Sequence, residues 1–457
     1  MALNHPKPAR PSLTRRELLR AGVVGVGGAL LPGARARAGS GVAPRRFLQI
    51  NLEGGWDSAF ATDPVVGTKM GSGNYEAVYL SSELAPQAVF GKPSLMLGPG
   101  LAPAANAFAR IPTAFVNGMF MEVSGHDFAQ QYMSSGILSL SNSRNYPAIP
   151  AILGAASETF PPHVVIGTAA PLGDTRFTSP PLQAYSIDAL NSMITGPSEA
   201  LVASPLREHY NDGLVAEAHA LIEDLDALVA DRAPPSVQQD LAAWRTSSSK
   251  IEQIYAKRLA GVLTATPEMA LRYGFEPGAV DVSPETQLAA ALLLLQSNLS
   301  PYITVTFASF DTHTQQMEVQ LPLQQRFARA LDVFISDLLA TGDPTDESLT
   351  LADTTTVYIT SEFVRTPTFS TLGGTEHWPS ASAIVLGRGV NDGVVIGATD
   401  DGAEALGWDG FEPVPTTETT QLLPDHLVAT LLSHVGTQEQ ADSVSPVRLD
   451  GLFVSKG

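Results

Sequence analysis

Residues 354–378 read TTTVYITSEFVRTPTFSTLGGTEHW. The β-branched run over 354–359 predicts a strand, because branched and aromatic side chains favour extended backbone. Glu362 follows at the tip of that strand, and a glycine-containing loop then leads to His377. In open α/β sheets, ligands bind beyond the carboxyl ends of the strands. A carboxylate and an imidazole at this place therefore predict a metal site or an acid–base site.

Two more predicted strands end in groups of the same chemistry. Strand 46–52 is followed by Asp57, and strand 302–307 is followed by Asp311 and His313. Asp311 and His313 are two residues apart, so their side chains share a face in an extended segment. Converging carboxylates repel one another unless a cation lies between them. We therefore predict a centre for one or two divalent ions, with these ligands: Asp57, Asp311, His313, Glu362 and His377.

The ligand types restrict the metal to a few candidates. Carboxylates with imidazoles suit zinc, manganese or iron, and a purely oxygen site favours magnesium or calcium. Each residue also has a simpler structural interpretation, since an Asp after a strand commonly forms a turn or caps a helix. Glu362 could pair with Arg365, and His377 could cap a loop.

The segment EVSGHDFAQQYMSSG, over residues 122–136, is a second candidate. Ser124 precedes a predicted turn, and His126 falls at a predicted helix start. A helix N-terminus offers free N–H groups and the positive end of a dipole, which suit an anion. Ser124 or His126 could therefore be catalytic, although Ser124 could instead cap the helix. The chain lacks G-x-S-x-G, H-E-x-x-H and Walker motifs, which disfavours an ordinary esterase, zincin or NTPase.

The order of the elements predicts an α/β protein with a mostly parallel central sheet covered by helices on both faces. Further strands are predicted over 113–117, 382–386 and 394–396. Helices are predicted over 214–232, 236–263, 284–299, 315–341 and 420–436. The stretch 138–185 is rich in Pro, Ser, Asn and Thr and predicts loops with short elements.

The composition excludes several classes of site. The chain has 457 residues, 44% of them hydrophobic, which is enough for a large core. It has no cysteine, which excludes disulfides, thiolate zinc sites, iron–sulfur clusters and a cysteine nucleophile. The net charge is −19, and removing the first 38 residues, with seven Lys/Arg and one Glu, makes it −25. We expect no nucleic-acid partner for so acidic a chain.

The first 38 residues have the three parts of a secretory signal. Arg15 and Arg16 precede a weakly apolar stretch over 21–31, and residues 36–38 read ARA. The paired arginines predict export by the twin-arginine machinery, and the apolar stretch is shorter than the ~20 residues of a membrane span. We expect a cleaved signal, one domain over 39–457 without a membrane span, and a periplasmic or secreted location. A disordered basic tail is the alternative.

Five motifs together resemble the bacterial family of unknown function called DUF1501. They are LEGGWDS, GHDFAQQYMSSG, FDTHTQQ, SEFVRTP and GGTEHW, in that order, after the twin-arginine signal. The resemblance implies membership of the alkaline phosphatase and sulfatase superfamily. The implied fold is a three-layer α/β/α sandwich, alkaline phosphatase-like, with metal-binding loops at one edge of the sheet.

The resemblance also implies roles for single residues. Asp57 is similar to the first ligand of the superfamily, Asp311 with His313 to its Asp…His pair, and His377 to its final histidine. The nucleophile at a helix start would fall near Ser124 or His126. Glu362 and Phe363 stand where the superfamily usually has Asp-His, so one imidazole is missing.

Two functions are consistent with these residues. The first is an exported metal-dependent hydrolase that acts on a phosphate or sulfate ester, in an anionic small molecule or polymer. The second is a non-catalytic periplasmic or surface binding protein on the same fold, favoured by the missing imidazole and the ambiguous nucleophile.

Overall fold

The computed structural model describes residues 46–64, 76–77, 86–140, 146–155, 157, 159, 161–167, 182–184, 263–276, 282–400, 402–409, 413–414 and 421–454. The signal predicted over 1–38 and the helix predicted over 214–232 lie outside these residues, as does the helix predicted over 236–263 except for its last residue.

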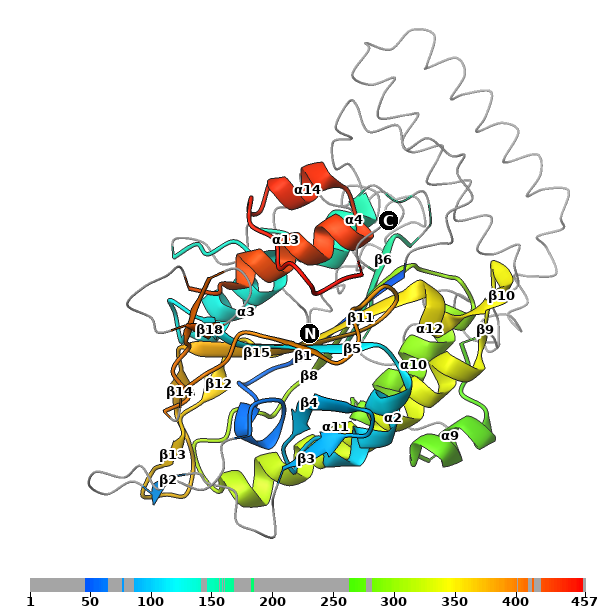
Figure 1. Ribbon diagram of the computed structural model, residues 1–457. Coiled ribbons are helices and arrows are strands. Elements are labelled where there is room, and N and C mark those ends of the chain that lie inside the picture. The colour runs from blue at the N-terminus through cyan, green and yellow to red at the C-terminus, as the bar shows by residue number, and fades with distance from the viewer. Residues whose placement is uncertain are drawn as a thin grey trace, which may run out of the picture.

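A mostly parallel sheet of eight strands forms the centre of the molecule (Figure 1). The strands follow the order β16-β5-β15-β11-β1-β8-β6-β7. Only β15 among them runs antiparallel to both of its neighbours. Their bounds are β1 Arg46–Leu52, β5 Thr113–Phe120, β6 His163–Gly167, β7 Leu182–Ala184, β8 Tyr302–Phe307, β11 Thr355–Thr360, β15 Ser380–Gly387 and β16 Val394–Ile396. Every residue of β1 is buried, as expected for a parallel strand covered on both faces.

Helices cover both faces of this sheet (Figure 1). One layer contains α2 Ala105–Arg110, α9 Pro267–Tyr273, α10 Pro284–Gln296, α11 Gln316–Ala340 and α12 Leu351–Thr354. The other contains α3 His126–Ser135, α4 Ile149–Ala155, α13 Pro424–Val435 and α14 Gln438–Asp442. The predicted three-layer α/β/α sandwich is therefore confirmed.

Small elements complete the described chain. They are the short helices η1 Ser58–Phe60 and η3 Ala102–Ala104, and the strands β2 Glu76–Ala77, β3 Gln87–Val89, β4 Lys92–Leu97, β9 Gly342–Asp343, β10 Asp346–Thr350, β12 Val364–Arg365, β13 Thr368–Phe369, β14 His377–Trp378, β17 Gly407–Trp408 and β18 Pro413–Val414. No helix in the described part of the chain is long and apolar enough to cross a membrane.

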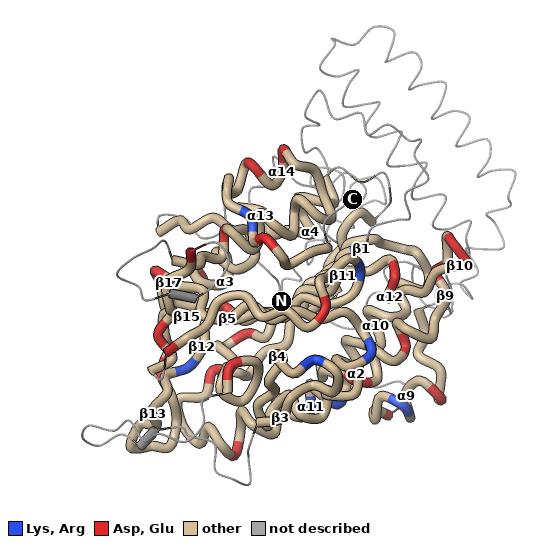
Figure 2. Tube along the Cα trace, in the orientation of Figure 1, with Lys and Arg blue, Asp and Glu red and all other residues tan. Residues whose placement is uncertain are grey.

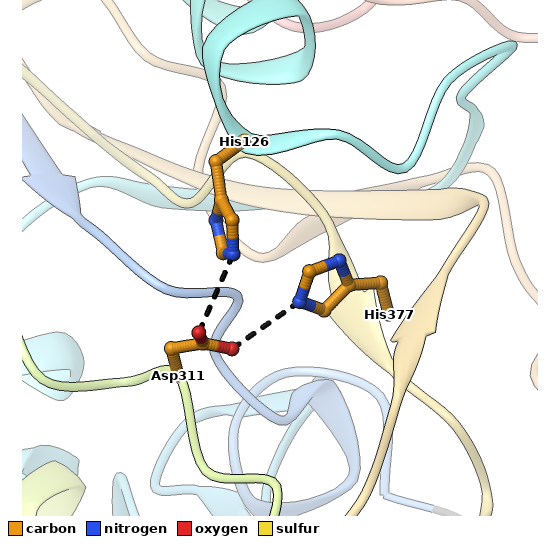
Figure 3. A group of neighbouring side chains, drawn as sticks. All are labelled: His126, Asp311 and His377. Carbon is orange, nitrogen blue, oxygen red and sulfur yellow. Dashed lines mark hydrogen bonds and ion pairs between the residues drawn. The ribbon is translucent and has the colours of Figure 1, made fainter.

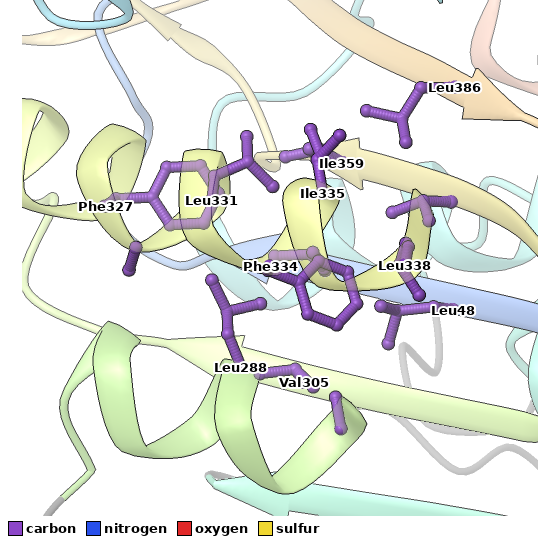
Figure 4. Close-up of a cluster of buried hydrophobic side chains, with 14 of the residues drawn as sticks. Leu48, Leu288, Val305, Phe327, Leu331, Phe334, Ile335, Leu338, Ile359 and Leu386 are labelled. Carbon is purple, nitrogen blue, oxygen red and sulfur yellow. The ribbon is translucent and has the colours of Figure 1, made fainter. Parts of the chain in front are cut away.

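The local signals explain where the two central helices of the first layer begin and how they pack. Ser283 caps α10 by accepting a hydrogen bond from Thr286 N, and Pro284 occupies the first helical position. Helix α11 buries an apolar stripe against α10 and the sheet (Figure 4). Its members Phe334 and Leu338 are fully buried, and burial of each such side chain stabilises the fold by roughly 1.5–3 kcal/mol.

One part of the sheet does not follow from the sequence pattern. The stretch 138–185 contains β6 and β7, which extend the central sheet beyond β8. His163 is buried in β6, its Nε2 lies 2.9 Å from Thr304 Oγ1, and burial lowers the pKa of its imidazole to about 3. The proline-rich composition of the flanking residues hides these short strands.

The sheet topology places the segments that follow β1, β8 and β11 at one edge. These three strands are neighbours and run parallel, so their carboxyl ends point the same way. Acidic positions are spread over the molecule and include this end, near β12 and β15 (Figure 2). The candidate functional residues of these strands therefore meet in one place.

Candidate metal centre

The loops after the three strands pack backbone against backbone, and two glycines permit the close approach. Gly54 has a φ of +117°, and a Cβ added there would lie 2.1 Å from Asp311 N. A Cβ added at Gly374 would lie 1.9 Å from the carbonyl carbon of His313. A real Cβ does not come that close to backbone, so the LEGG and GGTEHW motifs hold glycine for steric reasons.

A fully buried arginine joins the same loops. The Arg365 guanidinium donates from Nε to Gly55 O at 2.9 Å and from Nη1 to Thr375 O at 3.2 Å. Its Nη2 donates to the carbonyl oxygens of Gly54 and Phe310, and to Asp311 Oδ1 at 2.5 Å. A buried charge is stable only when its polar atoms are satisfied in this way.

Helix α3 is attached to the site by two polar contacts on one face. Nδ1 of His126, its first residue, lies 2.7 Å from Glu362 Oε1, which also accepts a hydrogen bond from Gly54 N at 2.7 Å. One turn later, Gln130 Nε2 donates to Glu53 Oε1 at 2.6 Å. Positions four residues apart share a helix face, so both contacts aim the same side of α3 at the sheet edge.

The imidazole of His377 approaches from the opposite loop (Figure 3). Strand β14 pairs His377 with Arg365 of β12. Its Nδ1 donates to Ser124 O at 2.8 Å, and its Nε2 lies 3.2 Å from Asp311 Oδ1. His126 Nε2 lies 3.5 Å from Asp311 Oδ2. One ligand atom from each of His126, Asp311 and His377 lies within 4.8 Å of the others, a grouping that could hold a metal ion.

Phe363 occupies the space beside both imidazoles. Its side chain is fully buried, and its ring centroid lies 4.4 Å from that of His377 and 5.1 Å from that of His126. Phe363 therefore packs against both imidazoles. This contact restrains the orientation of both rings.

The charges in the site influence one another. Partial burial raises the pKa of Asp311, but the hydrogen bond and charge of Arg365 outweigh it and bring the pKa to about 2. The hydrogen bond to Glu362 raises the pKa of His126. Both shifts arise because opposite charges lie close together in the site.

The donor set fits a divalent cation. A hydrogen bond from Nδ1 to the carbonyl of Ser124 requires that His377 carry its proton there, which leaves Nε2 free to bind a metal. Glu362 does the same for His126. Histidine ligands of metals almost always have such an acceptor on the other ring nitrogen. Two imidazoles and one carboxylate suit zinc, manganese or iron.

The structure brings together most of the residues predicted as ligands. His313 flanks the group, with Nε2 at 3.0 Å from Asp311 Oδ1 and Nδ1 at 2.9 Å from Glu376 Oε2. Glu362 contacts the group through His126. The alternative pairing of Glu362 with Arg365 is wrong, because the arginine turns to Asp311 instead.

Asp57 lies apart from this group. Its Oδ1 accepts a hydrogen bond from Ala59 N at 3.0 Å, as the cap of η1, and its Oδ2 accepts one from Gln316 at 3.0 Å. Burial raises the pKa of this carboxyl to about 6. These contacts match the turn-and-cap alternative, and its role as a ligand stays a prediction.

The two residues predicted as catalytic occupy different positions in the site. His126 begins α3, as predicted, and belongs to the candidate ligand group. Ser124 is exposed and does not cap the helix, because the N-cap is Gly125 and no side chain caps it. The alternative interpretation of Ser124 as a cap is therefore wrong. A histidine at a helix start near the strand ends is the signal that could have identified His126 as a ligand.

Comparison with known proteins identifies the family. No curated protein sequence is significantly similar to the chain. The lipoteichoic acid synthase LtaP from Listeria monocytogenes is a structural match with 8% identity and a TM-score of 0.34, over 95% of this chain and 79% of that one. Similarity at that level supports no inference about the site. The model of the family described as "Protein of unknown function (DUF1501)" matches residues 44–441. The chain therefore belongs to the DUF1501 family.

Proposed function

We propose that this protein is an exported, metal-dependent hydrolase of phosphate or sulfate esters. The observation that carries the proposal is the group of His126, Asp311 and His377, in which both imidazoles have their Nδ1 atoms held by fixed acceptors. The side chains of His126 and Asp311 are 40% and 42% exposed, so a substrate can reach them.

These three residues would hold the cation, with His313 beside them. When bound, a divalent cation polarises an ester oxygen and lowers the pKa of a nucleophile. Arg365 keeps Asp311 ionised and fixed in place. Glu362 and the Ser124 carbonyl keep the Nε2 atoms of the two imidazoles turned inward.

The start of α3 supports an anionic substrate. Gly125 is the N-cap and provides no side chain to occupy the free N–H groups of the first turn. A Cβ added at Gly125 would meet nothing nearer than a Phe128 ring carbon at 3.8 Å, so space is open there. Helix N-termini bind phosphate and sulfate through such N–H groups. Ser124 precedes this turn and is exposed, so its hydroxyl is our candidate nucleophile.

Metal analysis tests the proposal. We expect purified wild-type protein to bind a divalent metal and to hydrolyse a phosphate or sulfate monoester in a panel screened with zinc, manganese, magnesium and calcium. His377→Ala should lose both properties. His434→Ala, on α13, should keep them, because His434 hydrogen-bonds Arg388 O away from the site. Unchanged metal content in His377→Ala would refute the proposal.

A non-catalytic binding protein is the second candidate, and one observation favours it. Within the described part of the chain, no group hydrogen-bonds the Ser124 hydroxyl, so no base is in place to activate it. Retained metal binding and an absence of turnover across the whole panel would favour this candidate.

Export rests on the sequence of the first 38 residues. The pair Arg15-Arg16, the apolar stretch and the small residues near position 38 support passage through the twin-arginine machinery and a periplasmic or secreted location.

A further inference from the structure

Helix α11 buries a row of glutamines as well as its apolar stripe. Gln316, Gln320 and Gln324 are spaced four residues apart, so they share one face, and none is exposed to solvent. Burying an amide without partners costs several kcal/mol. The row therefore needs partners, and it finds them in the loops that form the metal centre.

Gln320, the middle residue, contacts the two segments on either side of the site. Its Nε2 donates to Phe310 O at 2.7 Å and to Thr312 Oγ1 at 2.9 Å, the residues directly before and after Asp311. The same amide accepts a hydrogen bond from Asp57 N at 2.5 Å and lies 3.2 Å from Gly55 O. One side chain thus joins the loop after β1 to the loop after β8.

We propose that Gln320 is a positioning residue that fixes the Asp311 carboxylate for metal binding. It acts directly, by holding the Phe310 carbonyl and the Thr312 hydroxyl on either side of Asp311. It also acts indirectly, because Gly55 O accepts a hydrogen bond from Arg365, which itself pairs with Asp311. In the described structure no hydrogen bond joins Gln320 to His126, Asp311 or His377, so we expect its effect to pass through the segments that hold Asp311.

The other two glutamines also hydrogen-bond the loop after β1, and Gln316 in addition accepts a hydrogen bond from Thr312 Oγ1. Gln316 Nε2 donates to Asp57 Oδ2 at 3.0 Å, and Gln324 Nε2 donates to Asp57 O at 3.1 Å. Gln324 has no hydrogen bond to residues 310–312 in the described structure, although its Nε2 also donates to Gln320 Oε1 at 3.1 Å. Loss of Gln324 should therefore weaken the fold and affect the carboxylate much less than loss of Gln320, because Gln320 then keeps its own bonds to Phe310 and Thr312.

The test uses three matched substitutions on α11 in the otherwise unchanged protein. Gln320→Met and Gln324→Met keep side-chain length but remove the amide. Gln325→Met is the outside control, because Gln325 is half-buried and, among the described residues, donates only to Pro99 O at 3.3 Å. Zinc affinity is measured by competition with a chromophoric chelator, and crystal structures are determined without metal.

We expect Gln320→Met to weaken zinc binding at least tenfold, the lower range for loss of a group that supports a ligand. Its metal-free structure should show the Asp311 carboxylate displaced from His377. Gln325→Met should bind zinc within twofold of wild type, and Gln324→Met should lower the melting temperature with a much smaller loss of affinity. The inference is overturned if Gln320→Met binds zinc within twofold of wild type and its structure shows Asp311 in place.

The inference rests on the proposed metal-dependent function, and the two can fail separately. If the wild-type protein binds no zinc or other divalent metal, the proposed function fails, and the position of Asp311 in the metal-free structures alone decides the role of Gln320. If Gln320→Met does not fold, Thr312→Val replaces it, because it removes one of the two contacts beside Asp311, together with the hydrogen bond from Thr312 to Gln316. A loss of threefold or more then supports the role, and an unchanged affinity overturns it.

Discussion

Glu362→Gln separates the charge of the buried carboxylate from its shape. Glu362 is 3% exposed, and its Oε1 is 2.7 Å from both Gly54 N and His126 Nδ1. Its Oε2 lies 3.1 Å from Ser361 Oγ. A glutamine amide can place its oxygen at the first position and donate from its nitrogen to the Ser361 hydroxyl. The substitution therefore keeps the hydrogen bonds and removes only the negative charge.

The expected losses follow from these contacts. A hydrogen bond to a charged group contributes ~1.5–3 kcal/mol and a neutral one ~0.5–1.5 kcal/mol, so weakening two of them lowers the free energy of unfolding by roughly 2 kcal/mol. Removing the carboxylate behind a histidine ligand typically costs 10–100-fold in metal affinity, which is about 1.4–2.7 kcal/mol. The pKa of His126 should fall as well, because the bond to Glu362 is the largest cause of its increase.

Zinc competition titrations and urea unfolding of the metal-free protein measure the two losses. Glu376→Gln is the matched control, because it is the same change at a carboxylate that is 60% exposed and contacts His313. A surface pair of this kind contributes at most ~1 kcal/mol, and we expect its zinc affinity to stay within about threefold of wild type. Equal zinc affinity in Glu362→Gln and wild type would refute the reasoning, as would an equal loss in both variants.

Substitutions at Gly374, at Asp57 and at the paired arginines have expected outcomes of their own. Gly374→Ala should strongly destabilise the protein and lower metal affinity, because its Cβ would overlap the His313 backbone. Gly373→Ala should cost only about 1–2 kcal/mol, since its Cβ meets nothing nearer than 3.9 Å and only its φ of +70° is strained. Comparable melting temperatures for the two variants would contradict this. Burial raises the folded-state pKa of Asp57 from 3.8 to about 6, so ionising this carboxyl disfavours the folded state. The free energy of unfolding should therefore fall as pH rises from 4 to 7. Asp57→Asn should remove this pH dependence, which amounts to at most on the order of 3 kcal/mol. Urea unfolding of both proteins across this pH range measures it, and parallel profiles would argue against a raised pKa. Replacing Arg15 and Arg16 together by Lys should leave the precursor in the cytoplasm in cell fractionation, and unchanged export would exclude the twin-arginine route.

Much of the fold could be predicted from local patterns. The strands over 46–52, 302–307 and 394–396 begin and end where alternation or branched runs indicate. Helix α10 begins at the predicted serine cap and proline. The strands β6 and β7 could not be predicted, because they are three to five residues long and are recognised only by the neighbours that pair with them.

The site could be predicted only in part. Polar residues that follow buried strands indicate a binding site at that edge of the sheet. Four of the predicted residues do gather there: Asp311, His313, Glu362 and His377. The choice among partners could not be made, since Asp311, Glu362 and Asp57 show the same signal in sequence. Their different surroundings arise from contacts across more than 50 residues of chain.

By itself, the sequence determined which chemical groups stand at the carboxyl ends of the strands, because side-chain periodicity and strand order are properties of the local chain. Only the tertiary structure decided that Arg365 pairs with Asp311, that Asp57 turns inward to Gln316, and that His126 joins His377. Such pairings depend on which buried charges and amides can be satisfied together when distant loops pack, and no local pattern contains that information.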